Sequence, residues 1–199
     1  MSRFIETIRA ENGCVQSIAL HQERVNRTLR FFQSKITINL TMELLSLSIK
    51  FIPTCRIRVE YDLSGVIGIE FFPYTIRKIN SIGIVQTGHR DYRFKYADRS
   101  WIHELVSQSG CDEIIMVEDN TVRDASIANL AFFDGRDWIT PNTPLLAGTM
   151  RKKLLEQGVI REAPIKLDML QWFDKIKLLN AMLTWEKSPE LPIGMIRLI

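Results

Sequence analysis

The stretch from Val122 to Arg151 constrains the fold more than any other part of the sequence. Asp134-Gly135 is a dipeptide favoured in two-residue type I′ turns, because both residues tolerate positive φ angles. The runs Asn129–Phe133 and Asp137–Thr140 flank this dipeptide, so we expect them to pair as antiparallel strands. Thr140-Pro141 should end the pairing, since proline has no N–H group to donate.

A helix start follows the expected hairpin. Gly148-Thr149 precedes Met150–Gln157, a segment of helix-forming residues, and Gly158 stands where helices often end. The unpaired N–H groups and positive dipole end of such a start bind phosphate groups readily. An ordinary hairpin followed by an ordinary helix is the alternative, and the segment by itself favours that alternative.

The composition is typical of a soluble globular chain. Of the 199 residues, 46% are hydrophobic and 25% are charged, which is enough to build one domain or two small lobes. The longest apolar runs are far shorter than a membrane span, and the first residues do not have the plan of a signal peptide. We therefore expect a cytoplasmic protein without a membrane partner.

Cysteines and histidines are scattered rather than grouped. Cys14, Cys55 and Cys111 form no CxxC pair, which fits a reducing compartment and argues against a structural zinc site. The histidines are His21, His89 and His103. We expect no bound metal.

The region Arg77–Arg99 is locally basic, although the net charge of the chain is only +3. Within it, the run His89–Lys95 interleaves aromatic and basic residues, a pattern that can bind nucleic acid or a phosphorylated ligand. A solvated surface loop is the simpler interpretation of this run, and we prefer it. We therefore expect no nucleic-acid partner.

Residues 1–73 predict an α+β lobe. Asn12-Gly13 is a second hairpin signal, and it lies between Phe4–Arg9 and Cys14–Ala19. A third hairpin is expected around Ser64-Gly65, with strands at Arg56–Tyr61 and Val66–Phe72. Between the first and last of these strands we expect two helices.

The first helix is marked by three apolar residues at helical spacing, Val25, Leu29 and Phe32. His21 and Arg24 share a different face of this helix, which could hold an anion or simply face solvent. Thr41 can cap the second helix, which we expect over Met42–Phe51. Pro53 should end it.

Residues 74–80 are the expected linker, and residues 81–199 are the expected second lobe. Its remaining elements are predicted as strands at Ser81–Gln86, Glu113–Val117, Ile165, Lys175–Leu179 and Ile193–Ile199, and helices at Asp98–Gln108 and Asp168–Phe173. Asp98 should cap the longer helix. The buried stripe of that helix is expected at Trp101, Ile102 and Leu105.

Several common motifs are absent from the sequence. No G-x-G-x-x-G follows a strand and no G-x-x-x-x-G-K-[ST] occurs, so the phosphate-cradling glycines of dinucleotide-binding and P-loop proteins are missing. No G-x-S-x-G nucleophile elbow is present either. The remaining candidates for chemistry are a lysine, an acid, an arginine and a helix start.

Seven short segments carry a family resemblance. They are Lys95-Tyr-Ala-Asp98-Arg99, Asp124, Ala128-Asn129-Leu130, Thr140-Pro141, Gly148-Thr149-Met150-Arg151, Phe4-Ile5-Glu6-Thr7-Ile8-Arg9 and His21-x-x-Arg24. Their order resembles the class IV aminotransferases, the fold-type IV enzymes that use pyridoxal 5′-phosphate. The resemblance implies a two-lobe α+β architecture, with a larger β-barrel-like C-terminal lobe and flanking helices. It also implies a small-molecule amino substrate and a homodimer.

The resemblance assigns a role to each matching residue. Lys95 is similar to the lysine that bonds to the cofactor aldehyde, and Asp124 falls where the family has a glutamate that faces the pyridine nitrogen. Arg24 resembles the arginine that binds the cofactor phosphate through a forked contact. The other implied cofactor-binding positions are Gly148, Thr149, Met150 and Asn180. The implied substrate positions are Thr7, Arg93 and Ala181.

Two segments favour one branch of the family, the 4-amino-4-deoxychorismate lyases. Lys95-x-x-Asp98-Arg99 is similar to the lyase pattern, and Leu179-Asn180-Ala181-Met182 resembles its late Asn-Ala segment. Such a lyase releases pyruvate and forms 4-aminobenzoate for folate. A class IV aminotransferase acting on branched-chain or D-amino acids is the alternative.

Two departures from the family pattern leave a further alternative. The strand and Gly-Asp-Gly turn that normally precede the phenylalanine matching Phe4 are missing, and Asp124 is one methylene shorter than glutamate. A protein that binds the cofactor or another phosphate ligand with impaired catalysis is therefore also compatible with the sequence.

Overall fold

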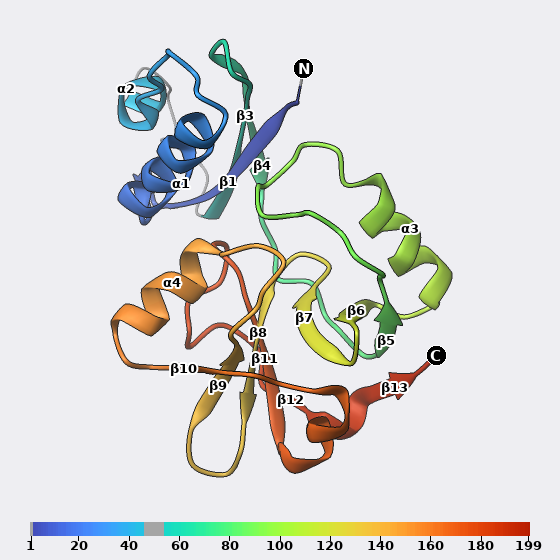
Figure 1. The fold of residues 1–199 in the computed structure, drawn as a ribbon. Coiled ribbons are helices and arrows are strands. Elements are labelled where there is room, and N and C mark those ends of the chain that lie inside the picture. The colour runs from blue at the N-terminus through green and yellow to red at the C-terminus, as the bar shows by residue number, and fades with distance from the viewer. Residues whose placement is uncertain (1, 46–53) are drawn as a thin grey trace. The chain divides into compact units, whose positions relative to one another are not determined.

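The computed structural model describes residues 2–45 and 54–199. The chain forms two compact units, of which the first comprises Met1–Ile76 together with Phe94–Asp98. The second comprises Arg77–Arg93 and Arg99–Ile199 (Figure 1). The first boundary therefore falls inside the segment 74–80, whereas the return of Phe94–Asp98 to the first unit was not expected.

The first unit is a four-stranded antiparallel sheet with two helices. The strands are β1 (Phe4–Glu11), β2 (Cys14–Val15), β3 (Thr54–Tyr61) and β4 (Val66–Pro73), in the order β2-β1-β3-β4. The helices are α1 (Ile18–Phe31) and α2 (Leu40–Leu45). Apolar side chains of both helices pack with those of β1 and β3 in one core cluster. The predicted α+β arrangement of this part of the chain is thus observed.

Local turn chemistry explains where the predictions for the first unit succeed. Glu11 pairs with Cys14, and the two residues between them, Asn12 and Gly13, have φ angles of 49° and 80°. Positive φ at both positions is what a type I′ turn requires. The expected strand Cys14–Ala19 is wrong after Val15, because Ser17 has a left-handed backbone and α1 begins at the next residue.

The second helix begins earlier than predicted. Asn39, not Thr41, accepts the backbone N–H of Met42 through its side chain (3.1 Å), and α2 starts at Leu40. The predicted end of this helix, at Phe51 and Pro53, lies outside the described residues.

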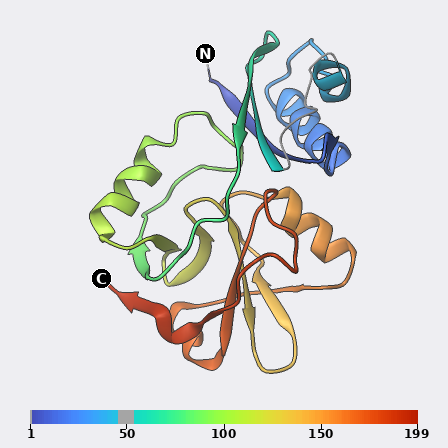
Figure 2. The ribbon, with the colours of Figure 1, turned by 180° about the vertical axis from the view of Figure 1, so that it is seen from behind.

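The second unit contains two sheets. The first has the order β13-β5-β6-β7, with β5 at Ile82–Gln86, β6 at Glu113–Glu118, β7 at Thr121–Ala125 and β13 at Ile196–Leu198. The second has the order β10-β9-β8-β11-β12, with β8 at Asn129–Phe133, β9 at Trp138–Pro141, β10 at Arg161–Ala163, β11 at Lys175–Leu179 and β12 at Leu191–Pro192. The C-terminal strand β13 pairs with β5 in the parallel sense, and both ribbon views show the C-terminus near β5 (Figure 1, Figure 2).

Two α-helices and two 3-10 helices complete the described part of the second unit. They are α3 (Ser100–Ser109), α4 (Thr149–Glu156), η1 (Leu167–Trp172) and η2 (Ile193–Met195). Among the described residues, no helix combines the length and the apolar character needed to span a membrane.

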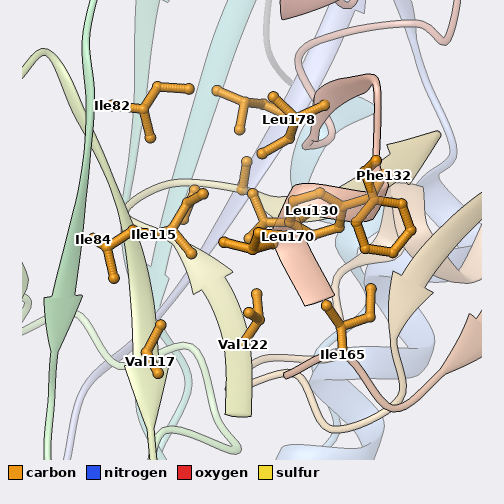
Figure 3. Packing of buried hydrophobic residues seen from close by; sticks show 14 of the residues in the cluster. Ile82, Ile84, Ile115, Val117, Val122, Leu130, Phe132, Ile165, Leu170 and Leu178 are labelled. Atoms are coloured by element: carbon orange, nitrogen blue, oxygen red, sulfur yellow. The ribbon is translucent and has the colours of Figure 1, made fainter. Parts of the chain in front are cut away.

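A shared core joins the two sheets of the second unit. Ile82 and Ile115 from one sheet lie close to Leu130 and Leu178 from the other, together with Leu170 of η1 (Figure 3). All five side chains are buried. Burial of each such side chain contributes roughly 1.5–3 kcal/mol, so this cluster holds the two sheets together.

Several element predictions for the second unit are wrong in detail. The loop between β8 and β9 is not a two-residue type I′ turn: Phe133 pairs with Trp138, and only Gly135 of the expected dipeptide has positive φ. Asp134 instead accepts the backbone N–H groups of Arg136 and Asp137 (3.0 and 2.7 Å). An acidic side chain that bonds its own turn makes the longer loop favourable.

The ends of other elements also differ. Ile165 is not in a strand, because β10 ends at Ala163. The expected final strand begins only at Ile196, after the 3-10 helix η2. The N-cap of α3 is Arg99 rather than Asp98, and only Ile102 of its expected stripe is fully buried.

Candidate functional site

A buried cluster in the first unit joins β1 to α1. Arg24 donates from Nε to Glu6 Oε1 (2.8 Å) and from Nη2 to Glu6 Oε2 (2.5 Å). His21 Nδ1 lies 2.6 Å from the same Oε2 atom. All three side chains are buried. The face of α1 that could hold an anion therefore holds the carboxylate of Glu6, and the solvent-face alternative is wrong for these two residues.

The charges in this cluster follow from its geometry. Burial alone would raise the pKa of Glu6, but the charge of Arg24 and the hydrogen bonds from His21 and Arg24 lower this pKa to about 2. Burial lowers the pKa of His21, against the opposing effect of Glu6. An ionised carboxylate only accepts hydrogen bonds, so His21 Nδ1 carries the hydrogen. Its Nε2 atom is buried and has no hydrogen-bond partner among the described residues.

Arg24 is thus already engaged by the protein itself. The forked contact that the family resemblance assigns to a phosphate is made here with Glu6. A phosphate bound by Arg24 would have to share the guanidinium group with this carboxylate. Sequence reasoning gave Glu6 no role, although one signal was present. Phe4, Glu6, Ile8 and Ala10 alternate along β1 and are all fully buried, so a glutamate stands in a row of core positions.

Lys95 lies in the same unit because its segment pairs with the beginning of β1. The backbone N–H of Ile5 donates to Lys95 O (2.9 Å), and the N–H of Ala97 donates to Arg3 O (2.9 Å). The side chain of Lys95 is half-buried, and its charge contributes to the lowered pKa of His21. The first unit therefore brings together Lys95 and Arg24, two of the residues that the sequence singled out.

A second cluster, in the second unit, surrounds Asp124. Asn129 Nδ2 donates to Asp124 Oδ1 (2.6 Å), and the backbone N–H of Leu146 donates to Oδ2 (2.9 Å). Burial raises the pKa of Asp124 to about 6, although these two hydrogen bonds and the charge of Arg151 oppose the rise. The buried acid is therefore ionised at neutral pH but close to its titration range.

The predicted helix start lies next to this acid. Gly148 is the N-cap of α4, and its backbone angles (φ −72°, ψ 148°) are open to any residue. A Cβ atom at this position would overlap Asn129 Oδ1. Asn129 thus contacts both Asp124 and the start of α4. The sequence comparison used Asn129 only as part of a matching segment. A polar residue at the start of the otherwise apolar strand β8 was the signal that could have indicated its role.

Other residues near α4 have structural contacts. Arg151 is buried, with Nε 3.2 Å from Thr140 Oγ1 and Nη2 2.8 Å from Pro141 O, and it also bonds Glu162. Arg99 donates to the backbone carbonyl of Ser126, two residues after Asp124. Both arginines hold the backbone around the Asp124 cluster.

The remaining predicted positions are less enclosed. Asn180 follows β11 and accepts the backbone N–H of Met182 (3.0 Å), with Ala181 between them in the turn. Thr7 is half-buried on β1, opposite Arg58 of β3. Arg93 is exposed and forms a two-point contact with Asp91, and His89 lies 2.7 Å from Glu118 Oε1. Acidic neighbours therefore neutralise part of the basic run.

Metal ligands are not grouped in the described part of the chain. No cluster of three or more histidine, cysteine, aspartate or glutamate side chains there could hold a metal ion.

The chain is similar to proteins of one family. The model of the amino-transferase class IV family matches residues 89–186. An uncharacterized protein from Haemophilus influenzae is 39% identical over 189 residues, which cover 92% of this chain and 98% of that protein. A crystal structure from Haemophilus somnus, provisionally named a 4-amino-4-deoxychorismate lyase, has a TM-score of 0.82 and 33% identity. It covers 92% of this chain and 97% of that chain.

A more distant structure shares the fold. A hypothetical aminotransferase from Mycobacterium tuberculosis in its PLP-bound form has a TM-score of 0.74 and 15% identity, covering 95% of this chain and 80% of that chain. The chain therefore belongs to the class IV aminotransferase family and has its fold-type IV architecture, as the sequence resemblance predicted. The family comprises aminotransferases and lyases that depend on pyridoxal phosphate.

The described residues fit this cofactor chemically. The second unit places a buried acid, Asp124, beside the start of α4, so a group for a pyridine nitrogen and a group for a phosphate occur in one cluster. Considered by itself, the first unit has a primary amine at Lys95, the group that can bond a cofactor aldehyde. Both Asp124 oxygens already accept a hydrogen bond, from Asn129 and Leu146, so a pyridine nitrogen would be a further donor to this carboxylate.

Proposed function

We propose that this chain is a pyridoxal-phosphate-dependent lyase of the 4-amino-4-deoxychorismate type, which releases pyruvate and forms 4-aminobenzoate. The observation that carries the proposal is the buried Asp124 carboxyl, held at the start of α4 in one hydrogen-bonded cluster. The provisional name of the Haemophilus somnus structure, at 33% identity, supports the lyase branch.

In this proposal each residue has a defined task. Lys95 Nζ would hold the cofactor aldehyde until the substrate amine replaces it there, and the freed amine would then move a proton at the substrate carbon next to that amine. The Asp124 carboxylate keeps the pyridine nitrogen protonated, and the first backbone N–H groups of α4 hold the phosphate. Pyridoxal phosphate supplies the electron sink when it is bound.

Cofactor binding is the first test. We expect the purified protein to take up pyridoxal phosphate with a visible absorbance band, and borohydride reduction should fix the label on the peptide that contains Lys95. Lys95→Ala should remove both signals. Lys78→Ala is the matched control, because Lys78 is exposed. Labelling that is unchanged in Lys95→Ala would refute the assigned lysine, and no uptake by the unmodified protein would refute the cofactor.

Substrate chemistry is the second test. Incubation of the loaded protein with 4-amino-4-deoxychorismate should release pyruvate and 4-aminobenzoate, which lactate dehydrogenase coupling and chromatography detect. Transfer of an amino group from a branched-chain or D-amino acid without pyruvate release would identify the aminotransferase alternative. Stable cofactor uptake with neither reaction would identify a binding protein that is catalytically impaired.

The family resemblance also leads us to propose a homodimer. Light scattering should then give twice the chain mass of 23.1 kDa. A monomer over the full concentration range would contradict this part of the proposal.

A further inference from the structure

Asn129 connects two parts of the second unit through a single amide group. Its Nδ2 atom donates to Asp124 Oδ1 (2.6 Å) and to the backbone carbonyl of Leu146 (2.7 Å). An amide nitrogen has two hydrogens, so these bonds use both and fix the plane of the group. Leu146 in turn donates its N–H to the other oxygen of Asp124 (2.9 Å). Neither Asp124 nor Asn129 can rotate without breaking one of these bonds.

Gly148 marks the other side of the same amide. Its φ of −72° is ordinary, so backbone conformation does not explain a glycine at the N-cap of α4. Packing does explain it: the three atoms nearest to a Cβ at this position all belong to Asn129, namely Oδ1, Cγ at 3.3 Å and Nδ2 at 3.9 Å. The missing side chain lets the Asn129 amide lie directly against the start of α4.

We propose that Asn129 is a positioning residue that couples the Asp124 carboxyl to the start of α4, so that the acid and the helix end keep a fixed separation. The inference rests on the proposed function, in which these two groups hold opposite ends of one cofactor. Asn129 contacts neither end of the ligand in this scheme. It acts through Asp124, by donating a hydrogen bond, and through Gly148, by filling the space that a side chain would take.

The first experiment needs no cofactor. The side-chain carboxyl of Asp124 can be titrated by carbon-detected NMR, where we expect its pKa near the value of about 6. Asn129→Ala should raise this pKa further, because the charged form loses a donor. Asn129→Asp keeps the volume of the side chain and places a second carboxyl there, so it should raise the pKa more. Asn142→Ala, at an exposed position of the same unit, is the control.

The second experiment is a double-mutant cycle on cofactor affinity. Gly148→Ala should weaken pyridoxal phosphate binding by about tenfold, because the new methyl group displaces the Asn129 amide. In the Asn129→Ala background the same change should have a much smaller effect, since the three atoms nearest to the methyl group have been removed. Gly194→Ala, where a Cβ meets nothing within 4 Å, is the matched control.

The two experiments separate this inference from the proposed function. An unchanged Asp124 titration in Asn129→Ala, or additive effects of the two substitutions, would overturn the coupling even if the cofactor binds normally. If the unmodified protein takes up no pyridoxal phosphate, the proposed function fails. The cycle is then measured on the free energy of unfolding, where suppression of the Gly148→Ala defect by Asn129→Ala supports the coupling and additivity overturns it.

Discussion

Glu6 and Asp124 are both buried carboxyl groups, one in each unit, yet their pKa values move in opposite directions. The pKa of Glu6 falls from 4.5 to about 2, whereas that of Asp124 rises from 3.8 to about 6. Burial pushes both values upward. The difference must therefore come from the hydrogen-bond donors that surround each carboxyl.

The donors differ in charge more than in distance. Glu6 receives two hydrogen bonds from the Arg24 guanidinium and one from His21. Asp124 accepts hydrogen bonds from the neutral amides of Asn129 and Leu146, at similar distances. A full positive charge offsets the cost of burying a carboxylate, and neutral donors offset only part of it. Glu6 is consequently a fixed anion, while Asp124 can gain a proton just below neutral pH.

The largest expected effect comes from removing the charge of Glu6. Glu6→Gln leaves the buried Arg24 guanidinium without its counter-ion, so the free energy of unfolding should fall by about 3–5 kcal/mol. Urea denaturation measures this loss. Glu70→Gln is the matched control, because Glu70 is exposed and pairs with Arg58 on the surface. Equal losses in the two variants would contradict the distinction between a buried and a surface pair.

Lowering the pH should destabilise the unmodified protein by protonating Glu6. The folded-state pKa of Glu6, about 2, lies below the usual 4.5, so its contribution is complete above pH 4.5 and is lost as the pH falls toward 2. The shift corresponds to roughly 3 kcal/mol. Urea titrations between pH 2 and 5 should show this loss. The loss should be much smaller in Glu6→Gln, and an unchanged pH slope in that variant would refute the assignment.

Asp124 should make the free energy of unfolding depend on pH in the opposite direction, with a smaller total change than Glu6. Its folded-state pKa is raised, so the protein gains stability from the neutral acid at low pH and loses it as the pH rises from about 4 to about 6. Asp124→Asn should remove this slope. Near pH 4 the variant should be less stable by about 1 kcal/mol, because an amide has only one acceptor oxygen for the two donors, Asn129 and Leu146, and one hydrogen bond is lost. If the pH dependence of stability between about pH 4 and 6 persists in Asp124→Asn, another titrating group causes it.

The smallest expected effect concerns a contact between an exposed histidine and a buried glutamate. His89 is 89% exposed and lies beside Glu118, which Arg123 also contacts through Nε and Nη2. His89→Ala should therefore change the free energy of unfolding by less than about 0.5 kcal/mol. A loss comparable to that of Glu6→Gln would show that the exposure of one partner does not decide the strength of such a contact.

Local patterns in the sequence predicted most of the elements correctly. The Asn12-Gly13 turn was predictable because its backbone requirement is met by the two residues themselves. The loop at Asp134 was predicted with the wrong turn, because an aspartate can also bond its own backbone and lengthen the loop. When a two-residue turn and a longer loop are both locally possible, the packing of the flanking strands decides between them. The dipeptide alone does not contain that information.

The clusters around Glu6 and Asp124 were predicted only in part, because they also depend on packing between segments far apart in the sequence. Arg24 and Asp124 were recognised as functional candidates, but their partners were not. Glu6 is separated from Arg24 by 18 residues, and Leu146 from Asp124 by 22 residues. Such partners meet only through the pairing of strands and the packing of helices. The reason for glycine at position 148 was likewise hidden, since it depends on Asn129 and not on its own φ angle.

The return of Phe94–Asp98 to the first unit has a consequence for how the chain can be divided. The polypeptide leaves that unit after Ile76, re-enters it at Phe94 and leaves again after Asp98. No single cut can therefore yield two fragments that each contain one complete unit. A ribosome must also add residues as far as Asp98 before the beginning of β1, which pairs with β3 on one side, can acquire its neighbour on the other side. The first unit therefore cannot finish folding until synthesis of the second is under way.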